Sequence, residues 1–244
     1  MKQYIIVFLI LVSCVQKSSI VKIISEPKES LPFLNLSKSQ LLGQINYKND
    51  SLFVLVNKNI ANKEIYLNRV AYDSFVEMYK QAKKDSIHLK ILSGLRNFED
   101  QKNIWIRKWN SLGHLDSISK ALKILEYSSM PGTSRHHWGT EVDLNSLNNS
   151  YFESGKGEKE YNWLCSNACK YGFYQPYTNR KNRTGYNEEK WHWSFLPLSK
   201  LYLNEYNKSI KIEDIKGFKG ALTSIKLKII SDYVNGIDAE LLIN

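Results

Sequence analysis

The chain has 244 residues, of which 43% are hydrophobic and 24% charged, and its formal net charge at pH 7 is +10. This composition excludes a mainly disordered chain and provides enough apolar surface for one well-buried domain with tails, or for two small domains. The positive balance favours anionic surroundings such as nucleic acid, a membrane surface or cell-wall polymers. Because no nucleic-acid-binding motif occurs and the cations do not cluster with aromatic residues, we expect no nucleic-acid partner and interpret most of the charge as a solvated lysine-rich surface.

The N-terminus has the pattern of an export signal. Lys2 precedes the apolar run YIIVFLILV, which is too short to cross a bilayer as a mature helix. Leu11, Ser13 and Cys14 fit a bacterial lipobox, in which the chain is cut before a cysteine that receives lipid; the alternative is a plain secretory signal with an incidental cysteine. We therefore expect residues 1–13 to be a lipoprotein signal peptide and Cys14 to be lipidated. The protein is then an exported, membrane-anchored lipoprotein that faces the periplasm or the cell exterior.

The rest of the chain divides into three expected parts. Residues 14–40 are polar without a sustained period and predict a tether, residues 41–200 predict the main folded domain, and residues 201–244 predict a C-terminal helical extension. Hydrophobic spacing and turn residues predict helices over 69–86, 97–110, 117–128 and 159–171, and strands over 88–92, 140–147 and 190–195. Because helices and strands mix without βαβ regularity, the expected class is α+β, with a small mixed or antiparallel sheet flanked by helices.

Two cysteines, Cys165 and Cys169, lie four residues apart on the helix predicted over 159–171. A disulfide is conceivable in an oxidising compartment, but positions i and i+4 of a helix do not bring the two Cβ atoms together without strain. We therefore expect two buried thiols rather than a bridge.

The segment SRHHWGTEVD, residues 134–143, contains two adjacent histidines followed by two acids at alternate positions. Glu141 and Asp143 fall on a predicted strand, so their side chains point to the same face. Either acid is able to join His136 at a metal ion, and spacing alone does not choose between them.

A second cluster, EKWH, places Glu189 three residues before His192. A catalytic zinc takes three protein ligands and keeps one position open for water. A neutral imidazole is a good zinc ligand, and a carboxylate held nearby accepts a proton from zinc-bound water. The two clusters together therefore predict a zinc site assembled from distant parts of the chain.

Taken together, these segments resemble the VanY-like D-alanyl-D-alanine carboxypeptidases, zinc peptidases related to the D-Ala-D-Ala dipeptidases. The resemblance rests on S-x-H-x-x-G-x-x-x-D followed by E-x-W-H, and on SGLRNFEDQ, which is similar to the family's S-G-x-R-x-x-x-x-Q. The segments MPGTSRHHWG, YNWLCSNACKYGF and EKWHWSF also fall in the expected order, so the resemblance covers about residues 40–200. It implies a zinc carboxypeptidase domain with the metal at the face of the sheet.

The resemblance implies a role for several residues. The implied zinc ligands are His136, Asp143 and His192; the implied catalytic residues are Glu189, as general base and acid, and Arg96; the implied substrate-binding residues are Arg96, Gln101 and Ser134. Glu141 stands where many relatives have a small residue, and we expect it either to support a ligand from behind or to line the pocket. His137 has no ligand role in the family and is expected to pack or to hydrogen-bond.

The implied function is removal of the terminal D-alanine from the stem peptide of peptidoglycan, by attack of zinc hydroxide with a glutamate as general base. Three alternatives stay open: an endopeptidase or an LD-carboxypeptidase on the same scaffold, and a non-catalytic zinc module that binds wall peptides. The expected partners are the stem peptide and, through the N-terminal lipid, a membrane. The oligomeric state is not predicted.

Overall fold

The computed structural model describes residues 36–61, 63–179 and 183–241. The expected signal peptide, Cys14 and most of the expected tether lie outside the described residues. The chain from residue 35 onward clusters as one compact unit, which contains the described residues after 200 as well as those before. Among the described residues, none of the helices has the length and apolar character needed to cross a bilayer.

Short strands alternate with helices of varied length along the described chain. The strands are β1 (Phe53–Leu55), β2 (Tyr66–Asn68), β3 (Ile91–Ser93), β4 (Glu141–Leu144), β5 (Phe173–Tyr174) and β6 (His192–Phe195). The α-helices are α1 (Lys38–Leu41), α2 (Arg69–Lys84), α3 (Phe98–Ser111), α4 (Ser117–Leu125), α5 (Gly155–Asn167), α6 (Leu196–Ser209) and α7 (Thr223–Lys226). The single turns of 3₁₀- or π-helix are η2 (Tyr47–Asn49), η3 (Arg135–Trp138), η4 (Asn149–Glu153), η5 (Ala168–Tyr171), η6 (Ile212–Asp214), η7 (Ile229–Val234) and η8 (Ala239–Leu241).

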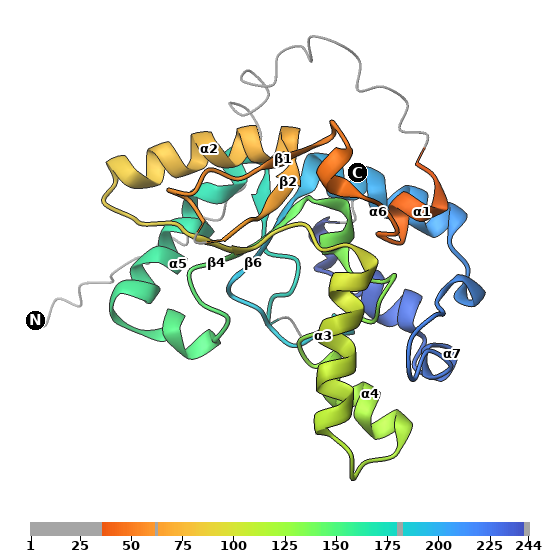
Figure 1. Cartoon of the computed structure of the whole chain (residues 1–244). Coiled ribbons are helices and arrows are strands. Elements are labelled where there is room, and N and C mark those ends of the chain that lie inside the picture. The colour runs from red at the N-terminus through yellow and green to blue at the C-terminus, as the bar shows by residue number, and fades with distance from the viewer. Residues whose placement is uncertain (1–35, 62, 180–182, 242–244) are drawn as a thin grey trace, which may run out of the picture. The chain divides into compact units, whose positions relative to one another are not determined.

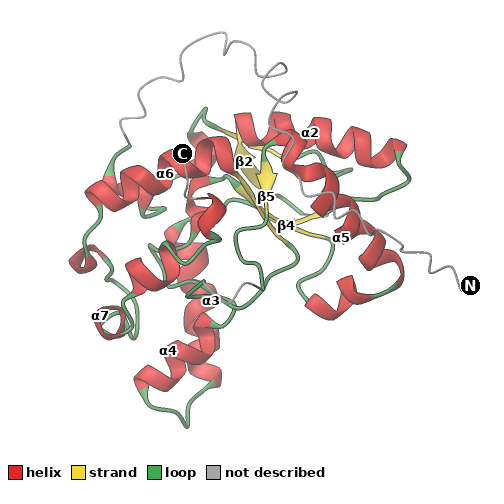
Figure 2. Ribbon diagram, turned by 180° about the vertical axis from the view of Figure 1, so that it is seen from behind, coloured by secondary structure: helices red, strands yellow, loops and turns green. Residues whose placement is uncertain are grey.

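Four of the strands form an antiparallel sheet in the order β3-β4-β6-β5, and β1 pairs with β2 separately. Figure 2 shows the strands enclosed by helices. In the central pair, Asp143 of β4 lies opposite His192 of β6, and Val142 lies opposite Trp193. Because side chains alternate along a strand, Asp143 and His192 share one face of the sheet, and Val142 and Trp193 share the other.

The face with Val142 and Trp193 is covered by α2 and α5, whose apolar residues join it in one core. Helix α2 begins where the Asn68 side chain accepts a hydrogen bond from the amide of Val70. Its buried residues recur at helical spacing: Ala71, Phe75, Met78 and Ala82. With this face of the sheet filled by apolar packing, the other face of β4 and β6 is left for polar side chains.

Helix α3 lies on the other side of β4 and β6 from α2 (Figure 1). Its start is fixed by a capping box, in which the side chains of Asn97 and Asp100 each accept a hydrogen bond from the other's amide. Trp105 donates a hydrogen bond of 2.9 Å to the carbonyl of Lys219, and the ring of Phe218 packs edge-on against it. The C-terminal part of the chain therefore holds α3 in place.

The α+β class expected from the sequence is confirmed, with an antiparallel sheet. The strands predicted over 88–92 and 140–147 are shorter and partly displaced, and Asn145 is the reason. Its left-handed φ of 61° ends β4. Its side-chain amide also donates to the carbonyl of His88 and accepts from the amide of Lys90, which keeps these residues out of the sheet until β3 begins at Ile91.

The described chain begins with a short helix inside the segment expected to be a tether. Ser37 and Gln40 form a capping box around α1. Leu41 is fully buried, and its carbonyl accepts a hydrogen bond of 3.2 Å from the indole of Trp138. The packed structure therefore starts a few residues before the boundary at 41 that we expected.

The expectation that Cys165 and Cys169 are buried is wrong. No disulfide joins them, Cys165 is exposed and Cys169 is partly exposed. The buried residues of α5 are Gly157, Glu160 and Leu164. This stripe passes one position before Cys165, so the two thiols lie on the border of the packed face rather than in it.

Gly139→Ala is expected to lower the free energy of unfolding by at least about 2 kcal/mol. Gly139 has a φ of +69°, and an added Cβ would lie 2.9 Å from the amide nitrogen of Asn68 and 2.9 Å from the ring of Phe53. Gly155→Ala is the matched control, because Gly155 also has a positive φ but no atom within 4 Å of an added Cβ. Chemical denaturation measures both, and an equal loss in the two variants would contradict the close-contact argument.

Candidate metal centre

Asp143 and His192 meet because β4 and β6 pair directly at these two positions. His192 Nδ1 lies 3.0 Å from Asp143 Oδ1, and both side chains are buried. The juxtaposition therefore follows from strand register and not from a flexible loop.

His136 reaches the same point from the turn that precedes β4. It lies in η3, which ends at Gly139 in the left-handed conformation, and the chain then enters β4. His136 Nδ1 lies 2.7 Å from the carbonyl oxygen of Gly94, so this nitrogen carries the proton and donates it. The unprotonated Nε2 is then the atom that faces Asp143 Oδ1, at 3.4 Å.

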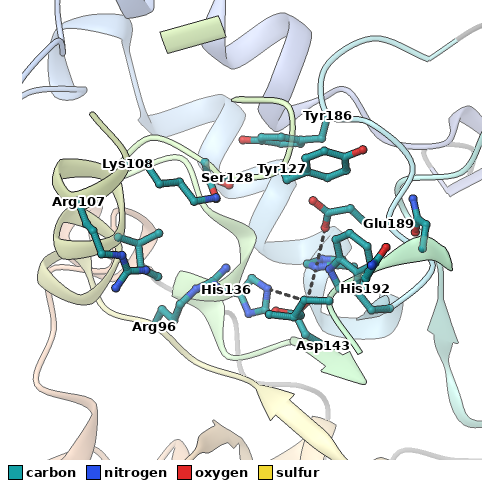
Figure 3. Close-up of a pocket in the computed structure, with 16 residues that line it drawn as sticks. Arg96, Arg107, Lys108, Tyr127, Ser128, His136, Asp143, Tyr186, Glu189 and His192 are labelled. Atoms are coloured by element: carbon teal, nitrogen blue, oxygen red, sulfur yellow. Dashed lines mark hydrogen bonds and ion pairs between the residues drawn. The ribbon is translucent and has the colours of Figure 1, made fainter. Parts of the chain in front are cut away.

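The three side chains fit a divalent metal ion. One ligand atom from each of His136, Asp143 and His192 lies within 4.8 Å of the other two, and Figure 3 shows the side chains converging at the cavity. Metal–ligand distances of about 2.0–2.2 Å in a tetrahedral site correspond to separations of roughly 3.3–3.6 Å between ligand atoms. The separations of 3.0 and 3.4 Å from Asp143 Oδ1 are near this range. Two imidazoles and one carboxylate are a donor set typical of catalytic zinc, and they leave a fourth position open.

A buried chain of polar groups supports His192 from behind. His192 Nε2 lies 2.9 Å from Glu141 Oε2. Glu141 Oε1 accepts a hydrogen bond of 2.8 Å from Ser194 Oγ and faces Arg135 Nη2 at 3.3 Å. A carboxylate that accepts the second N–H of a metal-binding imidazole orients the ring and raises its basicity. Of the two roles expected for Glu141, the structure therefore favours support of a ligand over lining the pocket.

The charges of this cluster set the protonation of the candidate ligands. Burial, followed by the charge of Arg96, lowers the pKa of His136, so this ring is neutral. Burial alone would lower the pKa of His192, but its hydrogen bonds with Asp143 and Glu141 and their charges raise it to about 10. Burial alone would raise the pKa of Asp143, yet the two imidazoles hold it well below its usual range. A metal ion that binds His192 Nδ1 therefore displaces a proton.

Glu189 lies beside the three candidate ligands, with Oε2 at 3.6 Å from His192 Nδ1. Its amide donates to the carbonyl of Tyr177, and its carbonyl accepts from the amide of His192, which fixes the turn before β6. Burial raises the pKa of Glu189 to about 8, against the opposing effect of His192. A divalent cation at the site would lower this pKa again. A buried carboxylate that changes protonation near neutral pH is the type of group that serves as a general base or acid.

Arg96 is fixed beside His136 by its own backbone. Its amide donates to the carbonyl of His136, and its carbonyl accepts a hydrogen bond of 2.7 Å from His137 Nδ1. His137 Nε2 in turn accepts from the amide of Gly132 at 3.0 Å, so this histidine packs and hydrogen-bonds as expected. The guanidinium of Arg96 lines the cavity, and its Nε has no hydrogen-bond partner among the described residues.

The site opens into a cavity of about 540 Å³. Besides the candidate ligands, Arg96 and Glu189, it is lined by Ile104, Arg107, Lys108, Tyr127, Ser128, Ser129, Leu147, Asn148, Asn149, Tyr186 and Trp191. In Figure 3, Arg107 and Lys108 lie on the side of the cavity opposite Glu189, and Tyr127 and Tyr186 lie above Glu189 in this view. The cavity therefore combines a candidate metal centre, a cationic wall and an aromatic wall.

Gln101 and Ser134 do not line this cavity. Both side chains are 1% exposed. Gln101 donates a hydrogen bond of 2.7 Å to the carbonyl of Ser129, which does line the cavity, so its contact with the cavity is indirect. The Gln101 Oε1 and Ser134 Oγ atoms have no hydrogen-bond partner among the described residues. Their predicted contact with substrate stays a prediction.

Sequence reasoning missed the partners that hold the ligands in place. Arg135 lies inside the motif segment, but nothing in its spacing indicates that η3 folds back so that its guanidinium meets Glu141. The Gly94 carbonyl is a backbone group and leaves no residue-type signal. The sequence did contain one signal for the wall formed by α3. Ile104, Arg107 and Lys108 are three and four residues apart and therefore share a helix face.

The fold and the donor set define an α+β protein with a buried His-Asp-His candidate metal centre. Comparison with known sequences adds the family: the sequence model described as VanY, D-alanyl-D-alanine carboxypeptidase, matches residues 64–198, which is more than half of the chain. The chain belongs to this family, as its motifs predicted. The three candidate ligands, Arg96 and Glu189 all lie within the matched residues.

Two curated bacterial proteins are similar to the same part of the chain. A putative carboxypeptidase, YodJ, of Bacillus subtilis is 31% identical over 134 residues, which are 54% of this chain and 46% of that protein. A D-alanyl-D-alanine carboxypeptidase of Enterococcus faecalis is 27% identical over 133 residues, 52% of this chain and 48% of that protein. The match therefore spans about half the length of these relatives.

Among solved structures, VanYB in complex with D-alanine-D-alanine is similar to this chain with a TM-score of 0.51. The identity is 22%, and the likeness covers 68% of this chain and 93% of that one. At this identity the likeness concerns the fold.

Glu141→Gln is expected to weaken metal binding about 10- to 100-fold, because an amide is a poorer acceptor for the N–H of His192 than a carboxylate. Chelator competition measures the affinity, and circular dichroism verifies that the variant is folded. Glu160→Gln is the matched control. Glu160 of α5 is also buried, but its carboxylate accepts a hydrogen bond from the hydroxyl of Tyr151 and contacts none of the candidate ligands. An unchanged affinity in folded Glu141→Gln would contradict the supporting role.

Proposed function

We propose that this protein is a zinc-dependent carboxypeptidase that removes the terminal D-alanine from peptidoglycan stem peptides. The observation that carries the proposal is the convergence of His136, Asp143 and His192 on one point with the buried carboxylate of Glu189 beside them. Membership of the VanY family supports the reaction and the substrate class. Zinc is proposed because the donor set, two imidazoles and one carboxylate with an open position, suits it.

The protein's own residues take two roles in this reaction. When bound, zinc supplies a Lewis acid that polarises a carbonyl and lowers the pKa of a coordinated water to about 7. Glu189 accepts a proton from the attacking water and delivers it to the departing amine, so no covalent intermediate with the protein is needed. Glu189 is largely buried but lines the cavity, so its carboxylate is placed to exchange protons with groups bound there.

Arg96 is proposed to bind the substrate next to the scissile bond. Its guanidinium is held beside His136 and presents N–H donors to the cavity. Such donors stabilise the charge that develops on the carbonyl oxygen, or hold the free carboxylate at the end of the substrate. A free carboxylate next to the scissile bond is the feature that distinguishes a carboxypeptidase substrate from an endopeptidase substrate.

We also propose that the protein acts outside the cytoplasm as a lipoprotein anchored through Cys14. The support is the basic, apolar and lipobox-like order of residues 1–14. A location outside the cytoplasmic membrane also gives the enzyme access to peptidoglycan.

Glu189→Gln is expected to reduce the turnover of a stem pentapeptide by about 10²- to 10⁴-fold, because the proton acceptor is lost while the three ligands remain. Mass spectrometry of the digested peptide measures the release of one alanine, and metal analysis measures bound zinc. Glu188→Gln is the matched control, since Glu188 is adjacent in sequence but does not line the cavity.

The same assay tests the metal. Removal of zinc with a chelator should abolish alanine release and lower the midpoint of thermal unfolding, and added zinc should restore both. Two outcomes of the peptide assay would contradict the proposal. Near-native turnover of zinc-loaded Glu189→Gln would contradict the role of Glu189 as general base. Cleavage of cross-linked muropeptides without release of alanine from pentapeptides would contradict the carboxypeptidase assignment.

Cys14→Ser is expected to abolish incorporation of a labelled fatty acid in a bacterial host that processes lipoproteins, and to release the protein from the membrane fraction. The reason is that the lipid attaches to the sulfur of this cysteine. Cys165→Ser is the control, because Cys165 lies within the folded unit. Persistent labelling of Cys14→Ser would refute the anchor.

A further inference from the structure

One wall of the cavity takes no part in the proposed chemistry. Helix α3 presents Ile104, Arg107 and Lys108 to the cavity. These positions are three and four residues apart and so share a face, whereas the buried residues Gln101, Trp105 and Trp109 form the adjacent stripe. The two cations therefore face the cavity because packing of the tryptophan stripe fixes the rotation of the helix.

The Lys108 ammonium is held in an unusual environment for a lysine. It is partly buried and donates a hydrogen bond of 2.6 Å to Ser128 Oγ, which also lines the cavity. Burial lowers its pKa, Glu189 acts in the opposite direction, and the charges of Arg107 and Arg96 lower it further. Buried lysines are rare without an anionic partner. Among the described residues, no carboxylate lies within ion-pair distance of Lys108.

The cavity as a whole carries excess positive charge. Three cations, Arg96, Arg107 and Lys108, line it together with only two carboxylates, those of Asp143 and Glu189. A bound divalent metal ion would add two further positive charges. Because the metal centre and Arg96 already provide for the scissile carbonyl and the terminal carboxylate in the proposed reaction, Arg107 and Lys108 are left without an anionic partner among the described residues.

We propose that Arg107 and Lys108 form a second anion-binding subsite, which binds a side-chain carboxylate of the substrate upstream of the scissile bond. The inference rests on the proposed function and names its substrate class: an acidic peptide with at least one carboxylate in addition to its C-terminus. Figure 3 shows the subsite across the cavity from Glu189, so the substrate extends from the metal centre toward α3. Arg107 is exposed and lies at the rim, whereas Lys108 lies deeper.

Two carboxylates of a stem peptide branch off its main chain and so have this chemistry. One is the α-carboxylate of the isoglutamyl residue, which is a side group because that residue is linked through its γ-carboxyl, and the other is the side-chain carboxylate of a diaminopimelyl residue. The test compares four stem pentapeptides: the fully acidic peptide, one with each of these two groups amidated, and one with the C-terminal carboxylate amidated. Affinities are measured by calorimetry on zinc-loaded Glu189→Gln, which is expected not to turn the peptides over, and KM is measured on the protein with Glu189 intact.

Amidation of the side-chain carboxylate that the subsite binds is expected to weaken affinity at least about tenfold. Replacement of both cations, Arg107→Gln with Lys108→Gln, should remove this difference between the two peptides. The effect of amidating the C-terminus should persist in the same variant. The single variant Arg107→Gln should show a partial loss of the difference in affinity between the acidic and the side-chain-amidated peptide. Because Arg107 is exposed, this variant keeps the test informative if the double variant does not fold.

Lys102→Gln is the control for net charge that matches the single variant Arg107→Gln, since each removes one positive charge. Lys102 lies on the same helix but pairs with Glu99 and does not line the cavity, so the preference for the acidic peptide should be retained. Increasing salt should reduce the preference in the intact protein, since part of it is electrostatic.

The outcomes separate the subsite from the proposed reaction. Hydrolysis with equal affinity for acidic and side-chain-amidated peptides overturns the subsite and leaves the reaction standing. A preference that depends on Arg107 and Lys108 without any hydrolysis overturns the reaction and leaves the subsite standing. If the double variant instead removes the effect of the C-terminal carboxylate, or if no peptide binds, the subsite is overturned.

Discussion

The pairing register of β4 with β6 is the constraint on which the site depends. In this register Val142 and Trp193 lie together in the core while Asp143 and His192 lie together on the opposite face. A slip of one residue would place the two candidate ligands in the apolar core and expose the core residues. The hydrophobic packing under α2 therefore also sets the distance between two of the candidate metal ligands.

The polar face of this pair is stable because its charged groups satisfy one another. Arg135, Glu141 and His192 form a buried chain, and Ser194 donates to the carboxylate in its middle. The Arg135 guanidinium also lies 5.0 Å from the ring of Trp138, which compensates in part for the hydrogen bonds that its Nε and Nη1 lack within the described residues. Breaking one member of such a chain leaves an uncompensated buried charge, which is costly. A small residue at position 141 would leave the buried charge of Arg135 without its carboxylate partner. Arg135 and Glu141 therefore depend on each other.

The fold class was predicted from local hydrophobic patterns, whereas the candidate ligands were predicted from the resemblance of whole motif segments to a known family, because spacing alone did not choose between Glu141 and Asp143. The spacing of His136 and Asp143 around a glycine turn, and of Glu189 and His192, is set within a few residues of chain. The boundaries of β3 and β4 depend instead on the side chain of Asn145, which bonds to backbone groups far away in sequence. In the same way, the contact of Arg135 with Glu141, and the position of α3 at the cavity, require the tertiary structure. Motif segments therefore identify the candidate ligands and Glu189, while the contacts that orient them emerge only from the fold.

The C-terminal residues contribute to the site without carrying any of its chemistry. The loop between β5 and β6, which carries Glu189, lies against the end of the chain: Thr178 donates to the Asp238 carboxylate, and Arg183 donates to the carbonyl of Gly236. The backbone of Gly185 packs so closely here that an added Cβ would lie 2.4 Å from the carbonyl oxygen of Asp232, so a side chain at this position would clash. These contacts come from residues beyond the segment that matches the family, so the extension after residue 200 supports the loop that carries Glu189 and, through Phe218 and Lys219, helix α3. The two walls of the cavity, the loop with Glu189 and the helix with Arg107 and Lys108, thus both contact this C-terminal part of the chain, which positions one wall relative to the other.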